Sequence, residues 1–327
     1  MRMVKALAAA AVISGAALHA PEAPAEETTL KAGFYSTSQK SQFRLAFNAF
    51  VDHLNETGEG RVAITEVVDT AAIPRDQMAQ ALKAGIVDLI AVPPSTMNKL
   101  VPGMGALSAT RVTSAEKREN GTFDLVNEYL ADNANARLIG LYAGDLPFHV
   151  FTNKPVRSLA DFEGLRLRGT NTNREAFAAL GAQPLKVGRS EIYTSMQRGV
   201  IDGYANINNG LWASSWVEVA KYRVDPGFFA PNIGIFVNLD VWNAMSDEQQ
   251  AILAAAGEYA EGEPTQRMVE AEAADAQRAV DEAGFEIIAL PEEDAGKFLD
   301  LVYGAQWDAI VADAPDLAAK LRSKIAE

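Results

Sequence analysis

The sequence predicts an α/β protein built as two lobes. Helix and strand patterns alternate along most of the chain, which favours mixed layers over separate all-helical or all-strand units. The length of 327 residues exceeds what one compact domain usually needs and fits two lobes of ordinary size. Residues 81–89 (A-L-K-A-G-I-V-D-L) and 195–203 (S-M-Q-R-G-V-I-D-G) also share one pattern.

This internal repeat consists of a helix end, a glycine, two β-branched residues and an aspartate. Gly85 and Gly199 are expected to cap their helices in the left-handed conformation. The residues that follow them, Ile86-Val87 and Val200-Ile201, are expected to enter a buried strand. The repeat is either a turn that any α/β protein reuses or a sign that the two lobes are of related build.

The first hundred residues contain three strand patterns and two helix patterns. Thr28–Tyr35 is expected to form the first strand, and Ser41–Asn55 an amphipathic helix with apolar residues at helical spacing. Arg61–Val68 alternates polar and apolar residues as a strand does. Arg75–Lys83 is helical, and Ile86–Val92 reads as a buried strand that two prolines stop.

The second half contains one long stretch of helix-forming residues. It covers Ser246–Glu282, with Ser246 or Asp247 as its N-cap and Gly284 closing it. Gly262 and Pro264 interrupt the stretch, so we expect either a kink or two helices end to end. Other strand patterns lie at Leu138–Tyr142, Phe148–Asn153 and Gly284–Leu290, and a helical pattern lies at Pro315–Ala326.

The N-terminus predicts a secretory signal peptide. Arg2 and Lys5 supply positive charge, residues 6–18 form a short apolar run, and Ala23–Ala25 give an A-x-A cleavage pattern. The run is too short to cross a bilayer as a helix. We expect cleavage after Ala25 and export to the periplasm, rather than a helical or disordered N-terminal arm.

The composition excludes several classes of function. The chain has no cysteine, which excludes thiol nucleophiles and thiolate metal sites, and an exported protein without disulfides depends on large cores for its stability. Its formal net charge is −14. This charge repels nucleic acid and anionic lipid and favours a soluble monomer, so we expect no nucleic-acid partner. Cations kept in a cleft would therefore be conspicuous.

No catalytic or metal-binding motif is apparent in the sequence. The histidines His19, His53 and His149 are not paired at metal-ligand spacing. No nucleophile elbow, Walker A loop or dinucleotide fingerprint occurs. We expect no enzyme, no cofactor and no metal site, although a metal ion bridging ligand and protein stays open. An exported hydrolase with paired carboxylates is the alternative, because carboxylates are plentiful.

Several linked motifs follow one another in the middle of the chain. They are S-L-A-D-F-E-G-L-R-L-R-G-T at 158–170, A-F-A-A-L-G-A-Q-P at 176–184, S-E-I-Y-T-S-M-Q-R-G-V-I-D-G at 190–203, and Asn206. In this order they resemble the C4-dicarboxylate-type (DctP) solute receptors of TRAP transporters. Weaker matches, such as residues 80–88 and 118–121, extend the resemblance over most of the mature chain.

The resemblance implies a two-lobed fold like that of type II periplasmic binding proteins, with the ligand enclosed between the lobes. Hinge strands and a long helix would join the lobes. The expected organisation is a signal peptide at 1–25, lobe I from 26–150 plus about 234–255, lobe II from 151–233 plus part of the C-terminal region, a spanning helix at about 246–283, and a C-terminal strand and helices at 284–327.

The resemblance assigns the signature arginine to Arg168. A guanidinium offers a planar fork of donors that binds a carboxylate through two hydrogen bonds, which suits this role. Arg166 lies on the same face of the expected strand, so a register slip would exchange the two. Asn206 matches the family asparagine that hydrogen-bonds a ligand oxygen, although it also precedes a turn-forming run. Asn171 could orient the same carboxylate or cap the helix that begins near Arg174.

The chain departs from the family pattern at two places. Many members have a second arginine before the strand at Phe148–Asn153, and this chain has none there. Arg189 stands where relatives often have an aromatic residue or proline. A second carboxylate would be underpaired unless Arg189 turns inward. We therefore favour a monocarboxylate, such as an aromatic, 2-oxo or 2-hydroxy acid, over a C4-dicarboxylate.

Further candidate wall residues come from both lobes. Aromatic residues near the motifs are either core or cleft lining; the candidates are Phe148, His149, Trp212 and Phe228. In the first lobe, Tyr35 and Ser95 follow strands, at the ends where open α/β sheets bind ligands. The expected partners are a small organic acid and the membrane subunits of a TRAP transporter. A receptor of the same fold that serves another type of transporter is a further alternative.

Overall fold

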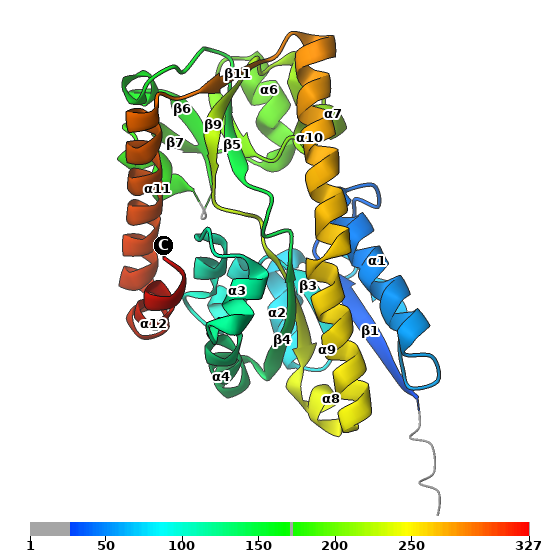
Figure 1. The fold of residues 1–327 in the computed structure, drawn as a ribbon. Helices are drawn as coiled ribbons and strands as arrows, with labels where there is room; N and C mark the ends of the chain where they lie inside the picture. The colour runs from blue at the N-terminus through cyan, green and yellow to red at the C-terminus, as the bar shows by residue number, and fades with distance from the viewer. Residues whose placement is uncertain (1–26, 171–172, 327) are drawn as a thin grey trace, which may run out of the picture.

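The computed structural model describes residues 27–170 and 173–326. In this part of the chain, helices surround two separate sheets and form two lobes, one above the other in Figure 1. The first sheet has the strand order β2-β1-β3-β10-β4, and the second has the order β11-β9-β5-β8-β6-β7. The predicted two-lobed α/β fold is thus confirmed. The predicted signal peptide and Asn171 lie outside the described residues.

The first lobe contains the N-terminal strands with their helices, and a strand from later in the chain. Its elements are β1 (Thr28–Phe34), α1 (Gln42–Thr57), β2 (Val62–Val68), η1 (Arg75–Gln77), α2 (Met78–Lys83), β3 (Leu89–Val92), η2 (Pro94–Lys99), η3 (Met104–Ser108), α3 (Ser114–Glu119), α4 (Thr122–Ala134), β4 (Ala136–Tyr142), β10 (Ile233–Asn238) and α8 (Leu239–Ala244). Ser41 caps α1 by accepting a hydrogen bond from the backbone of Arg44, and Phe47, Phe50 and Leu54 bury one face of this helix.

The second lobe is formed by the middle of the chain and one later strand. Its elements are β5 (Phe148–Thr152), η4 (Leu159–Phe162), β6 (Arg166–Gly169), α5 (Arg174–Ala179), β7 (Gln183–Lys186), η5 (Arg189–Glu191), α6 (Ile192–Gln197), β8 (Gly203–Asn206), α7 (Asn209–Ala213), η6 (Trp216–Glu218), β9 (Tyr222–Phe228) and β11 (Glu286–Ala289). Its apolar core includes Phe151, Tyr204 and Trp216, whose rings pack in sequence.

Two short segments carry the chain from one sheet to the other. One joins β4 to β5 across residues 143–147, and the other joins β9 to β10 across residues 229–232. Three non-glycine residues in these segments, Ala143, Phe229 and Asn232, have positive φ angles of 62°, 49° and 40°. Such conformations are uncommon for non-glycine residues, and surrounding structure must hold them. The crossing segments therefore have a defined backbone path.

The predicted long helix is two helices, α9 (Asp247–Glu261) and α10 (Glu263–Ala283), which meet at Gly262. Ser246 caps α9 in a capping box, and Gly284 ends α10 with a φ of 63°. Helix α10 contacts α1 of the first lobe and α7 of the second, and Figure 1 shows it running along both. Helices α11 (Glu292–Asp313) and α12 (Pro315–Ile325) flank the opposite side.

The two lobes have the same strand plan, which confirms that they are of related build. Read from its β7 edge, the second sheet runs β7-β6-β8-β5-β9, and each strand has a counterpart in β2-β1-β3-β10-β4. In both series the first three strands are parallel to one another, and the fourth strand is antiparallel to both of its neighbours. Gly85 and Gly199 have the predicted left-handed φ angles of 68° and 64°.

One expectation about the repeat is wrong. Ile86 and Val200 do not enter buried strands, because β3 begins at Leu89 and β8 at Gly203, and the side chains of Ile86 and Val200 are 61% and 46% exposed. The left-handed glycine turns the chain so that only the second β-branched residue of each pair faces the core. Val87 and Ile201 are accordingly buried.

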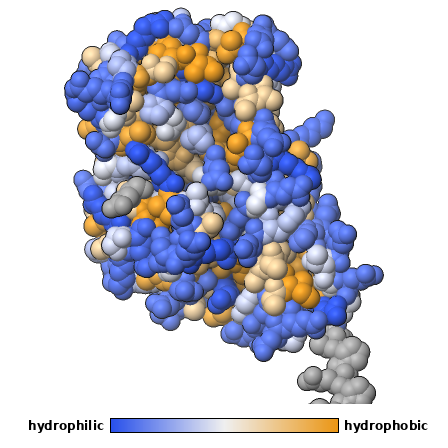
Figure 2. Space-filling view, viewed as in Figure 1, coloured by the Kyte–Doolittle hydropathy of each residue, from blue (hydrophilic) through white to orange (hydrophobic). Residues whose placement is uncertain are grey.

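Figure 2 shows that the face seen in Figure 1 is mostly hydrophilic, with apolar side chains visible in the hollow between the lobes. Across residues 27–170 and 173–326, no helix combines the length and the apolar character needed to span a membrane. Over the same residues, no group of three or more histidine and carboxylate side chains is placed to hold a metal ion.

Candidate ligand-binding cleft

Two arginines on strand β6 have different surroundings. Arg166 forms a two-pronged ion pair with Asp202, at 3.0 Å from Nε to Oδ2 and 3.0 Å from Nη2 to Oδ1. It also donates to the carbonyl of Gly199 at 2.6 Å. Burial acts to raise the pKa of Asp202, but hydrogen bonds from Arg166 outweigh it and lower that pKa. The guanidinium of Arg166 is thus already occupied by the protein's own carboxylate.

Arg168 has no such partner. Its Nε donates to the carbonyl of Val187 at 3.0 Å, and in the described part of the chain no carboxylate forms an ion pair with it. Burial lowers its pKa, and the charge of Arg189 lowers it further. A half-buried guanidinium beside another cation is poorly stabilised by the protein alone. It is therefore suited to receive an anion.

Arg189 is the cation beside Arg168, and it opens the short helix η5 after strand β7. Its guanidinium carbon lies 4.8 Å above the ring of Trp216. The side chain is exposed to solvent, yet desolvation by the protein around it lowers its pKa. Arg189 thus packs on Trp216 within electrostatic range of Arg168, and its role toward a second carboxylate stays a prediction.

Tyr35 of the first lobe lies across from Arg189. It follows β1, and its ring packs against Phe34 and Phe43, with centroids 4.8 Å and 6.3 Å away. Burial raises the pKa of the Tyr35 hydroxyl, and the nearby charges of Arg75 and Arg189 act in the opposite direction. Arg189 belongs to the second lobe, so the two lobes bring these groups within electrostatic range of each other. Tyr35 therefore lies within electrostatic range of the second lobe, and its role as a cleft wall stays a prediction.

Asn206 and His149 are neighbours on adjacent strands. They face each other in the β5–β8 pairing, and both are buried. The side-chain oxygen of Asn206 accepts the N–H of Ile207 at 2.8 Å. Nδ1 of His149 lies 2.8 Å from Oδ1 of Asp225, a carboxylate that Arg223 also binds. His149 is therefore held by an internal carboxylate, whereas the amide nitrogen of Asn206 makes no hydrogen bond within residues 27–170 and 173–326.

The predicted aromatic residues have different positions. Phe148 is half-buried and packs against the apolar cores on both sides of the hinge. Phe228 is fully buried among other rings, including Phe177 and Phe298. Ser95 is half-buried in η2, directly after β3, at the carboxyl end of that strand. Ligand contact by these three residues stays a prediction.

Trp212 packs on helix α10 and not on Arg168 or Arg189. Its indole N–H donates to the carbonyl of Asp275 at 3.1 Å, and the guanidinium carbon of Arg278 lies 3.7 Å above its ring. Both partners belong to α10, so Trp212 joins the second lobe to the spanning helix. The aromatic residue that supports the cleft is Trp216, beneath Arg189. Sequence spacing could not separate these two tryptophans, because both follow the same motif.

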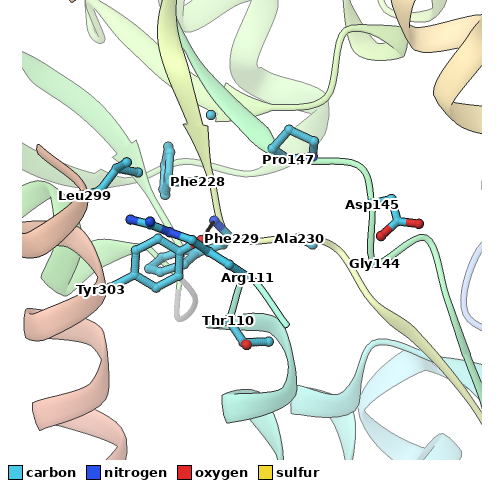
Figure 3. A pocket seen from close by; sticks show the side chains of 11 residues that line it. Thr110, Arg111, Gly144, Asp145, Pro147, Phe228, Phe229, Ala230, Leu299 and Tyr303 are labelled. Carbon is cyan, nitrogen blue, oxygen red and sulfur yellow. Dashed lines mark hydrogen bonds between the residues drawn. The ribbon is translucent and has the colours of Figure 1, made fainter. Parts of the chain in front are cut away.

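A pocket of about 450 Å³ lies beside the hinge segments. Arg111 and Tyr303 both line it and stack on each other, with the guanidinium carbon 5.1 Å from the ring centroid, and Phe228 and Phe229 also line it (Figure 3). The hydroxyl of Tyr303 accepts the N–H of Phe229 at 3.0 Å. None of the unpaired arginines of β6 and η5 lines this pocket. It is a feature of the hinge distinct from the arginine cluster.

Comparison with known proteins decides the family. The sequence model of the DctP family, described as bacterial extracellular solute-binding protein, family 7, matches residues 34–308. The chain belongs to this family. Among its relatives is a solute-binding protein of Roseobacter denitrificans, 29% identical over 271 residues, which cover 77% of this chain and 80% of that protein. The 2,3-diketo-L-gulonate-binding periplasmic protein of Escherichia coli is 26% identical over 303 residues, covering 88% and 89%.

Solved structures confirm the fold of this DctP-family protein. A TRAP periplasmic solute-binding protein of Rhodobacter sphaeroides in an open form without ligand has a TM-score of 0.80 at 21% identity, covering 92% of this chain and 100% of that one. The Roseobacter denitrificans protein with bound L-galactonate has a TM-score of 0.70 at 22% identity, covering 91% and 98%. The fold predicted from the resemblance, that of a two-lobed periplasmic binding protein, is thereby confirmed.

Proposed function

We propose that this DctP-family receptor binds a small organic acid between its lobes, with Arg168 holding the carboxylate. The observation that supports this role is the contrast on β6, where Arg166 is bound by Asp202 and Arg168 keeps its Nη donors free of any carboxylate in the described residues. A carboxylate is the planar acceptor that such a fork matches. Closure of the lobes would remove water and strengthen the pair.

The acid is proposed to carry an oxygen on the carbon next to the carboxylate, as 2-hydroxy and 2-oxo acids do. Asn206 offers an amide nitrogen on the neighbouring strand β8, and Arg189 adds donors beside Arg168. Relatives support this class: galactonate, bound by the Roseobacter protein, is a 2-hydroxy acid, and 2,3-diketo-L-gulonate, named for the Escherichia coli protein, is a 2-oxo acid.

The number of carboxylates on the ligand is a separate question. The sequence favoured a monocarboxylate because Arg168 was the one arginine that the resemblance assigned to the ligand. The charge of Arg189 acts on Arg168, and this supports a second cation near the first carboxylate. A dicarboxylate is therefore a second candidate that a specific observation supports. A hydrolase would need carboxylates facing each other across the cleft, whereas the groups brought together there are arginines and a tyrosine.

The proposed setting is the periplasm, with export through a signal peptide cleaved after Ala25. The protein would act as a monomer and deliver its ligand to the membrane subunits of a TRAP transporter. Mass spectrometry of protein secreted to the periplasm would check the cleavage site, because the mature chain should begin at Glu26. A mature chain that begins elsewhere, or a cytoplasmic protein, would contradict this part of the proposal.

A thermal-shift screen tests the receptor role. Mature protein, stripped of bound ligand by partial unfolding and dialysis, is mixed with matched acids such as lactate, pyruvate and propionate, together with sugar acids. We expect the 2-oxygenated acids to raise the melting temperature and the unsubstituted acid to do so less. The shift should vanish in Arg168→Gln and persist in Arg137→Gln, whose arginine stacks on Trp242 in the first lobe. A folded protein that shifts with no acid would refute the proposal.

A further inference from the structure

Glu272 on helix α10 is a buried carboxylate without an ion-pair partner. Two acidic residues are buried in the described part of the chain, Asp202 and Glu272. Asp202 is paired with Arg166, whereas Glu272, which is 7% exposed, forms no ion pair within residues 27–170 and 173–326. Burying a carboxylate without an opposite charge costs stability. A costly group of this kind is expected where it serves the function of the protein.

The carboxylate of Glu272 binds the backbone at the start of α7. Its Oε2 accepts the N–H of Asn208, and its Oε1 accepts the N–H of Asn209 at 2.8 Å. The side chain of Asn208 donates in return to the carbonyl of Glu272 at 3.3 Å. Arg223 also donates to the side-chain oxygen of Asn208, at 3.2 Å, but its charge is taken by a carboxylate of its own strand. Residues 207–210 are therefore held chiefly by helix α10.

This segment adjoins the proposed ligand groups of the second lobe. The N–H of Ile207 donates to Oδ1 of Asn206 at 2.8 Å, which leaves the amide nitrogen as the end that can meet a ligand. A methyl group added to Gly210 would lie 3.4 Å from that nitrogen and 2.4 Å from a ring carbon of Trp216. Trp216 is the ring on which Arg189 stacks. A shift of the segment would therefore displace Asn206 and press on the support of Arg189.

Helix α10 holds the other end of α7 as well. The indole N–H of Trp212 donates to the carbonyl of Asp275, about one turn along α10 from Glu272. Helix α10 also contacts α1 of the first lobe, and Figure 1 shows it running along both lobes. Both ends of α7 are thus fixed to the helix that joins the lobes. Of the two contacts, that of Glu272 is the one next to Asn206.

We propose that Glu272 is a positioning residue for the ligand, because it holds residues 207–210 so that the amide nitrogen of Asn206 meets the oxygen next to the ligand's carboxylate. This inference deepens the proposed function and rests on it. An amide N–H selects that oxygen only within about 3 Å and in a suitable direction. A glutamine at position 272 would keep one acceptor oxygen and turn its NH2 group toward one of the two N–H donors, so the segment would have to move.

Pairs of acids that differ only in the 2-hydroxyl group test the proposal. They are lactate with propionate, 2-hydroxybutyrate with butyrate, and galactonate with 2-deoxygalactonate. Calorimetry on the mature protein would compare wild type, Glu272→Gln and the control Asp275→Asn, which removes a half-buried carboxylate from the same helix but leaves its carbonyl to Trp212. We expect wild type to bind at least one hydroxy acid about tenfold or more tighter than its partner, the equivalent of about 1.4 kcal/mol.

In Glu272→Gln this preference should fall to less than about threefold, with the affinity for the unsubstituted acid unchanged, and Asp275→Asn should keep it. The side-chain amide signal of Asn206 in nitrogen-15 NMR spectra, assigned with Asn206→Asp, should move in Glu272→Gln and stay in place in Asp275→Asn. Thermal melting at pH 8 should show Glu272→Gln at least as stable as wild type, because the variant removes a buried charge.

These measurements separate positioning from a structural role. The inference is overturned if Glu272→Gln keeps the preference, if it melts well below wild type, or if Asp275→Asn loses the preference equally. Any of these results, together with lost binding in Arg168→Gln, would retain the receptor role. A wild type that binds acids without preferring the 2-hydroxyl group would reject the role of Asn206 and this inference together. Unchanged binding in Arg168→Gln would reject the proposed function itself.

Discussion

The contrast between Arg166 and Arg168 gives the sharpest prediction. The two arginines lie two residues apart, yet replacing Arg166 should lower stability and replacing Arg168 should weaken ligand binding. Arg166→Gln removes a two-pronged partner from Asp202, whose side chain is only 5% exposed. Breaking a fully buried pair costs about 3–5 kcal/mol, and an exposed pair contributes at most about 1 kcal/mol. Arg166 is 39% exposed and Lys154 still approaches Asp202 at 3.3 Å, so we expect about 2 kcal/mol.

Arg168→Gln should affect binding instead. It removes one hydrogen bond, to Val187, and relieves a cation that burial and Arg189 disfavour, so the unliganded protein should keep its stability. Losing a charged fork in a closed site costs about 2–5 kcal/mol, and we therefore expect the affinity for the best acid to fall about 30-fold or more.

Two measurements separate these effects. Thermal melting without ligand should show Arg166→Gln lower by about 4 °C or more, using about 2 °C per kcal/mol for a chain of this size, and Arg168→Gln within about 1 °C of wild type. Calorimetry should show near-normal affinity in Arg166→Gln and weak binding in Arg168→Gln. The reverse assignment, with Arg168→Gln unstable but still binding, would refute the reasoning and would make Arg166 the ligand residue.

Three further predictions concern stability. Gly85→Ala and Gly199→Ala should each cost about 1 kcal/mol and cost the same in chemical denaturation, because both have positive φ and no atom within 4 Å of an added methyl group; unequal costs would argue against equivalent turns. Gly257→Ala should cost more, about 3 kcal/mol, since its methyl group would lie 2.4 Å from the carbonyl of Ile139, and a mild effect would show that α9 can shift. Burial raises the pKa of Glu272 to about 7, above its ordinary value of 4.5, so the folded state holds this proton more tightly and stability should fall as pH rises from about 4.5 to about 7. This fall should be smaller in Glu272→Gln by up to about 3 kcal/mol, and equal pH profiles of wild type and variant would contradict the shift.

Much of the fold could be predicted from residue order because its signals are local. The apolar periodicity of α1, the cap at Ser246 and the left-handed glycines at 85 and 199 act within a few residues, and all were confirmed. The boundary of β3 was missed because the left-handed turn at Gly85 redirects Ile86 outward, an effect that periodicity alone does not show.

The candidate site was only partly predictable for the same reason. The sequence by itself determined the two-lobed α/β fold and the family, since linked motifs and turn residues are written in consecutive positions. It could not determine which arginine of β6 is free, because Asp202 lies 36 residues beyond Arg166 and reaches it only through the pairing of β6 with β8. Only the tertiary structure decided that Trp212 packs on α10 and that Arg189 packs on Trp216, because these contacts join segments that no local pattern connects.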